Sequence, residues 1–198
     1  MTFAATRSTL ALLCLLVASA IASPVRAGEP APSDDEWHEG VPPDASFRVR
    51  GPVPFTVLPS DGQAPTMQGV VATQPGAFGT PIKYVARCIA QPGDHRPDAA
   101  RIEEAADFWR RQAAFAYQRD VRVGALAGIE FQLSDPGKTL RVRVLASPER
   151  VCTLFVQWNA AAKPRDAVIE RFLGSFEPVA APGKPGGPRS GKAGSAAH

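Results

Sequence analysis

Two pairs of arginines at alternate positions are the residues best placed for chemistry. Arg48 and Arg50 lie in one short apolar segment, and Arg141 and Arg143 lie in another. Alternation places both members of a pair on the same side of a β-strand. If the two strands share a face, the four guanidinium groups form a basic surface that would hold an acidic protein or an anionic ligand. The alternative is the solvated face of an antiparallel sheet, where charges oppose edge-to-edge aggregation.

The three histidines do not predict a catalytic or metal site. His38 lies in an acidic stretch, His95 follows Asp94 in a loop rich in Pro and Gly, and His198 is the last residue. An acidic linker binds cations without fixed geometry, so we interpret the surroundings of His38 as solvated. His95 is interpreted as an exposed loop residue, and a pH-sensitive pair with Asp94 is the alternative.

One segment imitates a phosphate-binding loop. Residues 186–192 have the spacing of its glycines and lysine, but Ala193 stands where a Ser or Thr must hold the metal, and Pro188 removes a backbone donor. The chain also has no G-x-S-x-G, H-E-x-x-H or C-x-x-C motif. The sequence therefore predicts no catalytic residue, no metal and no cofactor, and we expect a protein that is not an enzyme.

The first residues have the pattern of a secretory signal. Arg7 precedes an apolar run over 10–22, and Val25-Arg26-Ala27 follows as a site of small-residue type. The run is shorter than the roughly 20 apolar residues that cross a membrane. We expect cleavage after Ala27, with no membrane span afterwards and a periplasmic or secreted location. A retained N-terminal anchor is the alternative.

Cleavage would leave two cysteines, Cys88 and Cys152, in an oxidising compartment. Both lie in apolar, strand-like segments, so a disulfide between them would join strands that are distant in the sequence. The alternative is two buried free thiols.

Charge and composition divide the rest of the chain. Residues 28–45 contain six acids and no Lys or Arg, and we expect a flexible acidic linker there. Residues 46–177 are long enough for one domain with one core, and 178–198 have the Pro, Gly and Ala content of a disordered tail. Losing Arg7 and Arg26 lowers the formal net charge from +3 to +1, which does not favour nucleic acid as a partner.

Apolar periodicity predicts the elements of the domain. Strands are expected over 47–50, 55–58, 67–73 and 82–90, and a long amphipathic helix over 98–118 with Asp98 as its N-cap. Alternation over 129–133, 140–144 and 151–158, with turns at 135–137 and 147–149, predicts a three-stranded antiparallel meander. Pro164 opens a final helix whose apolar stripe is Ile169, Phe172, Leu173 and Phe176.

With these elements in place, residues 46–177 resemble the PsbP-like domains of bacterial extracytoplasmic proteins. The match consists of the Phe47-x-Val49 strand with prolines after it, Gly128-Ile129-Glu130-Phe131, the Arg141/Arg143 strand and the closing Arg171-Phe172-Leu173-Gly174-Ser175-Phe176. The resemblance implies an α+β fold in which an antiparallel β-sheet is sandwiched between helices. It also implies an accessory or binding role, and it supplies no catalytic residues.

The chain departs from this family at one position. Similar sequences have an aromatic residue two positions after the arginine that opens the last strand, whereas Arg150 is followed by Val151 and Cys152. A Cys88–Cys152 disulfide in place of aromatic packing fits that departure.

These observations give two leading hypotheses about function, ahead of a third, an enzyme whose pocket would gather His95 with carboxylates or arginines. The first is a non-catalytic extracytoplasmic accessory protein that binds a protein or envelope component of unknown identity through Arg48, Arg50, Arg141 and Arg143. The alternative is a carrier of a small ligand, with an apolar pocket between the sheet and the long helix near Trp109 and Phe115.

Overall fold

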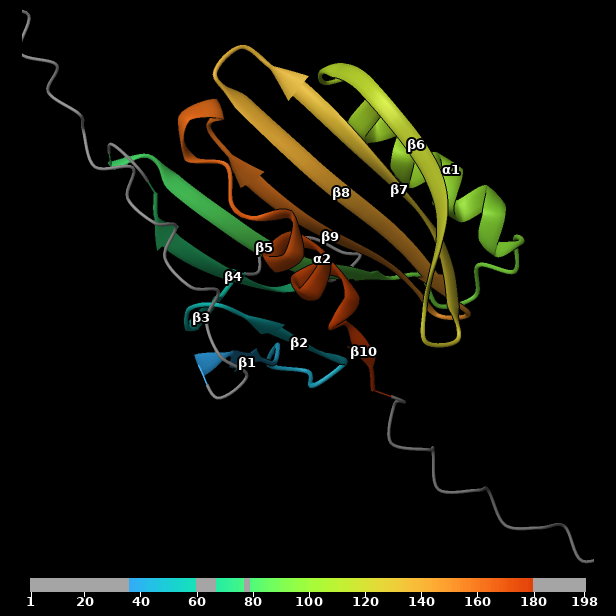
Figure 1. The fold of residues 1–198 in the computed structure, drawn as a ribbon. Helices are drawn as coiled ribbons and strands as arrows, with labels where there is room; N and C mark the ends of the chain where they lie inside the picture. The colour runs from blue at the N-terminus through green and yellow to red at the C-terminus, as the bar shows by residue number, and fades with distance from the viewer. Residues whose placement is uncertain (1–35, 60–66, 77–78, 180–198) are drawn as a thin grey trace, which may run out of the picture. The chain divides into compact units, whose positions relative to one another are not determined.

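The computed structural model describes residues 36–59, 67–76 and 79–179 (Figure 1). The predicted signal peptide, the imitation of a phosphate loop and His198 lie outside these residues. The strands are β1 (His38–Gly40), β2 (Phe47–Gly51), β3 (Phe55–Val57), β4 (Met67–Pro75), β5 (Pro81–Ala90), β6 (Ala114–Val123), β7 (Leu126–Asp135), β8 (Lys138–Ser147), β9 (Arg150–Trp158) and β10 (Glu177–Pro178). The helices are α1 (Asp98–Arg110), α2 (Asp166–Gly174) and a 3-10 turn at Ala160–Ala162.

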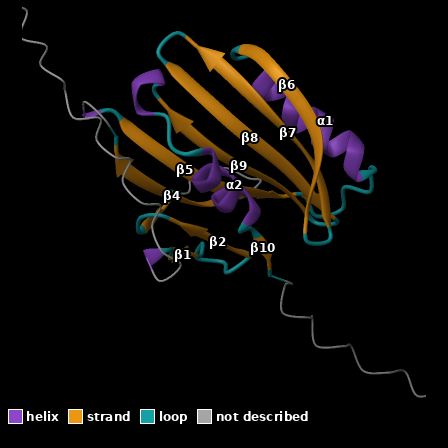
Figure 2. Ribbon diagram, viewed as in Figure 1, coloured by secondary structure: helices purple, strands orange, loops and turns teal. Residues whose placement is uncertain are grey.

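Seven strands form one large antiparallel sheet in the order β3-β4-β5-β9-β8-β7-β6 (Figure 2). The predicted meander is confirmed as β7, β8 and β9, each paired with the next. Gly137 has a φ of 87° in the turn between β7 and β8, a conformation that favours glycine. The predicted α+β class with an antiparallel sheet is therefore confirmed.

The two faces of this sheet bury two separate apolar cores. Ile102, Ala106 and Trp109 of α1 pack on one face, mainly over β7 and β8. The other face is covered by α2 together with a small sheet of order β1-β2-β10, so it does not carry helices alone (Figure 1). All four residues of the predicted apolar stripe are buried in this second core: Ile169, Phe172 and Leu173 within α2, and Phe176 just after its end.

The long helix is shorter than predicted. It ends at Arg110, where the backbone N–H of Gln112 donates to the carbonyl of Trp109, and the chain continues as β6 from Ala114. Pro97, not Asp98, is the N-cap, and it supplies no side-chain hydrogen bond. The expectation of a helix to residue 118 is wrong because alanine-rich sequence favours a helix locally, while pairing with β7 supplies backbone partners that local propensity does not register.

The predicted boundaries of the domain also need correction. Residues 38–40 of the expected flexible linker form β1, and Asp44 pairs with Arg150, so the described part of this segment is ordered by contacts. Residues 28–35 lie outside the described residues. At the other end, β10 includes Pro178 of the expected tail, and residues 180–198 are not described.

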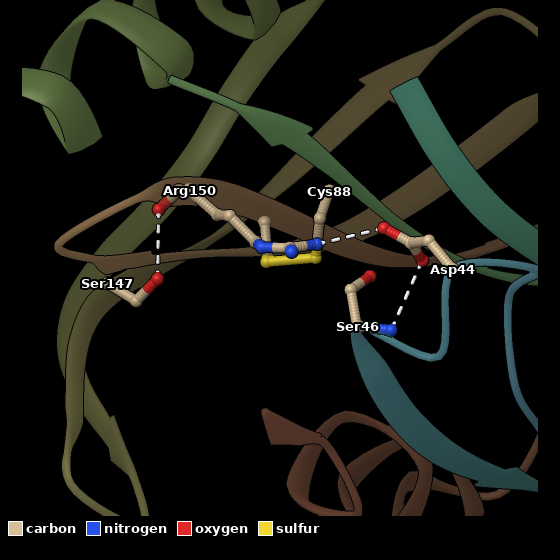
Figure 3. The surroundings of a disulfide bond; sticks show 6 residues. Asp44, Ser46, Cys88, Ser147 and Arg150 are labelled. Carbon is tan, nitrogen blue, oxygen red and sulfur yellow. Dashed lines mark hydrogen bonds and ion pairs between the residues drawn. A yellow bond between two sulfur atoms is a disulfide. The ribbon is translucent and has the colours of Figure 1, made fainter. Parts of the chain in front are cut away.

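The disulfide between Cys88 and Cys152 is confirmed. The two residues lie directly opposite each other in the β5–β9 ladder, and both are buried in the core under α2. Figure 3 shows Asp44, Ser46 and Arg150 gathered beside this bond. Nη1 of Arg150 lies 3.0 Å from Oδ2 of Asp44, while Oδ1 of Asp44 accepts from the backbone of Ser46. The bond thus links strands β5 and β9 in the middle of the large sheet, and it lies close to the segment that leads into β2.

Candidate functional site

The four arginines of the predicted basic surface do not form one surface. Arg141 and Arg143 are buried, with exposed fractions of 9% and 5%, on the face of β8 that looks toward α2. Arg48 and Arg50 are exposed on β2 of the small sheet. The predicted shared surface is therefore wrong, because the polar side of β8 is covered by another layer instead of by solvent.

Arg141 and Arg143 surround one fully buried carboxylate, Glu130 of β7. Nε of Arg143 donates to Oε2 of Glu130 at 3.0 Å, and Nε of Arg141 donates to Oε1 at 2.9 Å. Arg119 of β6 also donates to Oε1, at 2.7 Å through Nη2. Glu170 of α2 closes the cluster by accepting from all three arginines. We call these five residues the Glu130 cluster.

Electrostatics keep Glu130 ionised. Burial by itself raises the pKa of a carboxyl group, but the hydrogen bonds from Arg143 and Arg141 outweigh burial, and the net pKa of Glu130 is lowered. The hydroxyl of Tyr117 also donates to Oε1, at 3.2 Å, so both oxygens of this carboxylate accept hydrogen bonds from protein side chains. An ionised carboxylate with its oxygens filled has no proton to give and no position for a substrate, so the Glu130 cluster is a structural feature.

Arg48 and Arg50 alternate with buried residues of β2, as predicted, but acids stand beside them. Arg48 lies opposite Glu177 of β10, and Arg50 lies opposite Glu39 of β1. Cross-strand neighbours of opposite charge reduce the local positive potential. Binding of an acidic partner by these two arginines stays a prediction, and it now rests on a smaller surface than the sequence suggested.

A cavity of about 370 Å³ lies beside α1, above β5 and β9. It is within the size range of sites that hold small molecules. Its apolar wall comes from both the helix and the sheet, and includes Trp109, Phe108, Ile89 and Val151. Its polar groups are those of Arg87, Arg101, Gln91, Glu104 and Thr153. A carrier pocket between sheet and helix was predicted near Trp109, and Trp109 does line this cavity.

Arg101 is the unusual residue of this cavity, because it is only 2% exposed. Its Nη2 contacts Oδ1 of Asp98 and donates to the carbonyl of Ser147 at 2.7 Å. Its Nε and Nη1 are buried and find no acceptor among the described residues. Oε1 of Gln91, also in the cavity wall, is a buried acceptor that finds no donor among the described residues. Buried donors without acceptors are costly, and Arg101 would lose that cost if its guanidinium turned toward an acceptor in the cavity.

Arg87 places a second cation at the same cavity. Its guanidinium carbon lies 5.4 Å from the ring centroid of Trp109, and Nη1 contacts the sulfur of Met67 at 3.9 Å. Among the residues that the structure describes, Arg87 forms no ion pair. Burial lowers the pKa of Arg87 from its ordinary value, although such a group stays charged. Trp109 is fixed in turn by Phe155, whose ring centroid is 5.3 Å away.

The chain matches no family model and no curated protein. Among solved structures it is similar to a protein from Bacteroides thetaiotaomicron VPI-5482, with 12% identity and a TM-score of 0.46. That match covers 73% of this chain but only 49% of the other, so the chain spans about half the length of that protein. It is also similar to PA94 of Pseudomonas aeruginosa, a protein of unknown function described as a putative regulator, with 14% identity and a TM-score of 0.40. This match covers 64% of this chain and 85% of that one.

Phe115 does not belong to the cavity beside α1. It lies on β6 and is 42% exposed, with its ring centroid 5.7 Å from that of Phe131 and 5.8 Å from the guanidinium of Arg110. The prediction that it lines the pocket with Trp109 is wrong because α1 ends at Arg110. Past that point the residues run back along the edge of the sheet instead of continuing the helix face.

Neither of the two described histidines lines the cavity beside α1 or belongs to the Glu130 cluster. His38 is in β1 and His95 is in the loop before α1. No group of three or more His, Cys, Asp or Glu side chains that could hold a metal occurs in the described ranges. None of the described helices has the length and apolar character that crossing a membrane requires.

Sequence reasoning missed both Glu130 and Arg101 as special residues. Glu130 occupies the polar side of a strand whose hairpin partner carries Arg143, so the hairpin register contained a signal for the pair. Arg101 has the spacing of the charged, solvent-facing side of an amphipathic helix. Only the packing of α1 against the end of β8 buries it, and no sequence signal marks that contact.

Proposed function

We propose that this protein is a non-catalytic binding protein that works outside the cytoplasm, and that it holds a small molecule in the cavity beside α1. One observation carries the proposal: Arg101 is buried at the cavity wall with donors on Nε and Nη1 that have no acceptor in the described part of the chain. A bound ligand with acceptor oxygens would remove that cost if the guanidinium turned toward it.

The proposal includes the resemblance to PsbP-like domains and their arrangement of a sheet between helices. It is supported by α1 on one face and α2 on the other, and by the position of the meander before the closing helix. The extracytoplasmic location is supported by the Cys88–Cys152 disulfide, because such bonds persist in oxidising compartments. The predicted signal over 1–27 points the same way.

Native mass spectrometry tests the proposed function. The protein is purified gently from the envelope fraction of its own host, and the expected result is a population carrying one small molecule that organic solvent extracts. Ala105 of α1 lines the cavity, so an Ala105→Phe variant should fill the space and arrive without the ligand. Ala100→Phe is the matched control, since Ala100 is exposed on the same helix. A wild-type protein that is always empty, or a ligand that both variants retain, would contradict the proposal.

A further inference from the structure

We propose that the ligand of this cavity is an amphiphile with a single anionic oxygen-bearing head, such as a medium-chain carboxylate, an inference that rests on the proposed function. The head would lie between Arg101 and Arg87, and the apolar body would lie along Trp109 and Phe108. Charge, unused hydrogen-bond donors and apolar surface each support this assignment.

The charge of the cavity wall is positive. Arg87 has no carboxylate partner among the described residues, and Arg101 shares Asp98 only through Nη2. The one acidic residue in the wall, Glu104, has its Oε2 2.8 Å from Nη2 of Arg96, outside the cavity. Arg87 in this partly desolvated space therefore lacks an anion within the described part of the chain, and Asp98 contacts only one nitrogen of Arg101.

The donor groups define the head more closely. A guanidinium has five N–H donors and no acceptor, and those of Arg101 on Nε and Nη1 are unpaired. A neutral ligand with one carbonyl would use a donor but leave the charge of Arg87 without a counter-ion. A carboxylate has several lone pairs and a full charge, so it matches both the number of donors and their sign.

The remaining wall is apolar and partly open to solvent. Phe108 is 49% exposed, which is unusual for a large aromatic side chain on a helix that packs its opposite side in the core. Phe108 and Trp109 meet edge to face, with ring centroids 5.7 Å apart, and Ile89 and Val151 lie below them on the sheet. An alkyl or aromatic body over these side chains would remove apolar surface from water.

Another cavity has a larger volume but lacks this chemistry. The space of about 570 Å³ between α1 and β6–β7 is lined by Asp98, Glu103 and Asp120 as well as Arg122. None of the buried unpaired polar atoms found among the described residues belongs to its wall. A third cavity, of about 460 Å³, has the buried unpaired Oγ of Ser46 in its wall, but its one arginine, Arg150, is paired with Asp44. The cavity beside α1 is therefore distinguished by an arginine that has no ion pair among the described residues, together with buried unpaired donors.

Isothermal titration calorimetry with three probes of equal chain length tests the assignment. The probes are decanoate, decanol and decyltrimethylammonium, added to solvent-extracted protein. The two ions are kept below their micelle-forming concentrations and decanol below its solubility limit. Decanoate is expected to bind one molecule per chain, decanol roughly tenfold more weakly or worse, and the ammonium not measurably. Equal binding of decanol and decanoate would overturn the anionic head while leaving the proposed cavity function intact.

One arginine variant and one lysine control test whether the anionic head binds at the cavity. Arg101→Met risks misfolding, because Arg101 holds the start of α1 to the end of β8, so the test uses Arg87→Met. It should weaken decanoate roughly tenfold and leave decanol unchanged. Lys83→Met is the control, because Lys83 is exposed on the same face of β5 and outside the cavity wall. Equal losses in both variants would reduce the effect to net charge and overturn the assignment.

Absence of binding by all three probes distinguishes failure of the amphiphile assignment from failure of the proposed cavity function. If none of the three probes binds but native mass spectrometry finds a ligand that Ala105→Phe loses, the amphiphile is wrong and the cavity function stands. If no probe binds and the wild-type protein carries nothing, both are wrong.

Discussion

Glu130 lies directly opposite Arg143 in the β7–β8 ladder, and Arg143 holds its Oε2 through both Nε and Nη2. Glu130 has no exposed surface, so its charge is supported entirely by neighbouring side chains. Because Glu170 from α2 contacts the same arginine, the pair also links the large sheet to the layer that covers it. The Glu130 cluster therefore reports directly on how α2 is packed.

Replacing Glu130 with Gln should destabilise the protein by about 3 kcal/mol, because three guanidinium groups would lose their buried counter-charge. Urea denaturation followed by circular dichroism measures the change. Glu149→Gln is the control, since Glu149 is exposed in the β8–β9 turn, and it should change the free energy of unfolding by less than about 0.5 kcal/mol. Similar small effects for both variants would contradict a structural role for Glu130.

The stability lost in Glu130→Gln should itself depend on pH. The folded-state pKa of Glu130 is lowered below its ordinary value of 4.5, so its contribution is fully present above 4.5 and is lost as the pH falls through the lowered pKa. Unfolding curves of the wild type and the variant should therefore differ most near neutral pH and approach each other in acid. A difference that stays constant down to the acid limit would exclude ionised Glu130 as its cause.

The four arginines of the predicted surface should divide into two classes. Arg143→Ala should cost about 2 kcal/mol, because it removes a buried partner of Glu130, while Arg141 and Arg119 remain. Arg48→Ala is the comparison on an exposed strand position, and it should stay within about 0.5 kcal/mol. Thermal unfolding of the two variants side by side decides this, and equal shifts would refute the division.

Removing the disulfide with Cys88→Ala and Cys152→Ala together should lower the free energy of unfolding by about 4 kcal/mol, since the bond closes a loop with a sequence separation of 64. Guanidinium denaturation measures the loss. Wild-type protein unfolded in the presence of a reductant should give the same curve as the double variant. A variant as stable as the oxidised wild type would show that the bond contributes nothing to the fold.

Trp109 and Phe115 were predicted to share a pocket, and their substitution should now give opposite results. Trp109→Ala removes a buried ring from the α1 core and should lower the free energy of unfolding by about 3 kcal/mol. The same substitution should abolish ligand binding. Phe115→Ala changes a partly exposed ring on β6 and should cost less than about 1 kcal/mol, with ligand binding retained. Loss of binding in Phe115→Ala at unchanged stability would return Phe115 to the site.

The elements that sequence predicted best are those whose signal is local. Alternation in β7, β8 and β9, together with the Pro136–Gly137 turn, was sufficient to place the meander, because side-chain period and turn chemistry agree there. The end of α1 was misjudged because β6 takes its backbone partners from β7, which lies beyond it in the sequence. The apolar pattern of residues 98–118 carries no information about a strand that pairs with them from further along the chain.

The candidate site was less predictable than the fold for a related reason. Arg141 and Arg143 have the alternation of a solvated strand, and the layer that covers them comes from α2, more than twenty residues later. Arg101 has the spacing of an exposed helix position, but it lies against the end of β8. There its Nη2 donates to the backbone carbonyl of Ser147. In both cases a third element decides burial, and periodicity describes only one element at a time.

The small sheet has a mechanical consequence for the chain. Its middle strand, β2, is paired on one side with β1, which has three residues, and on the other with β10, which has two. These are the first and last strands that the structure describes, so a pulling force applied at Glu36 and Val179 would load their short ladders before the nine- and ten-residue strands of the large sheet. The cavity beside α1 is on the opposite face of that sheet. Tension on the ends of the domain would therefore open the small sheet first and leave the walls of the cavity in place.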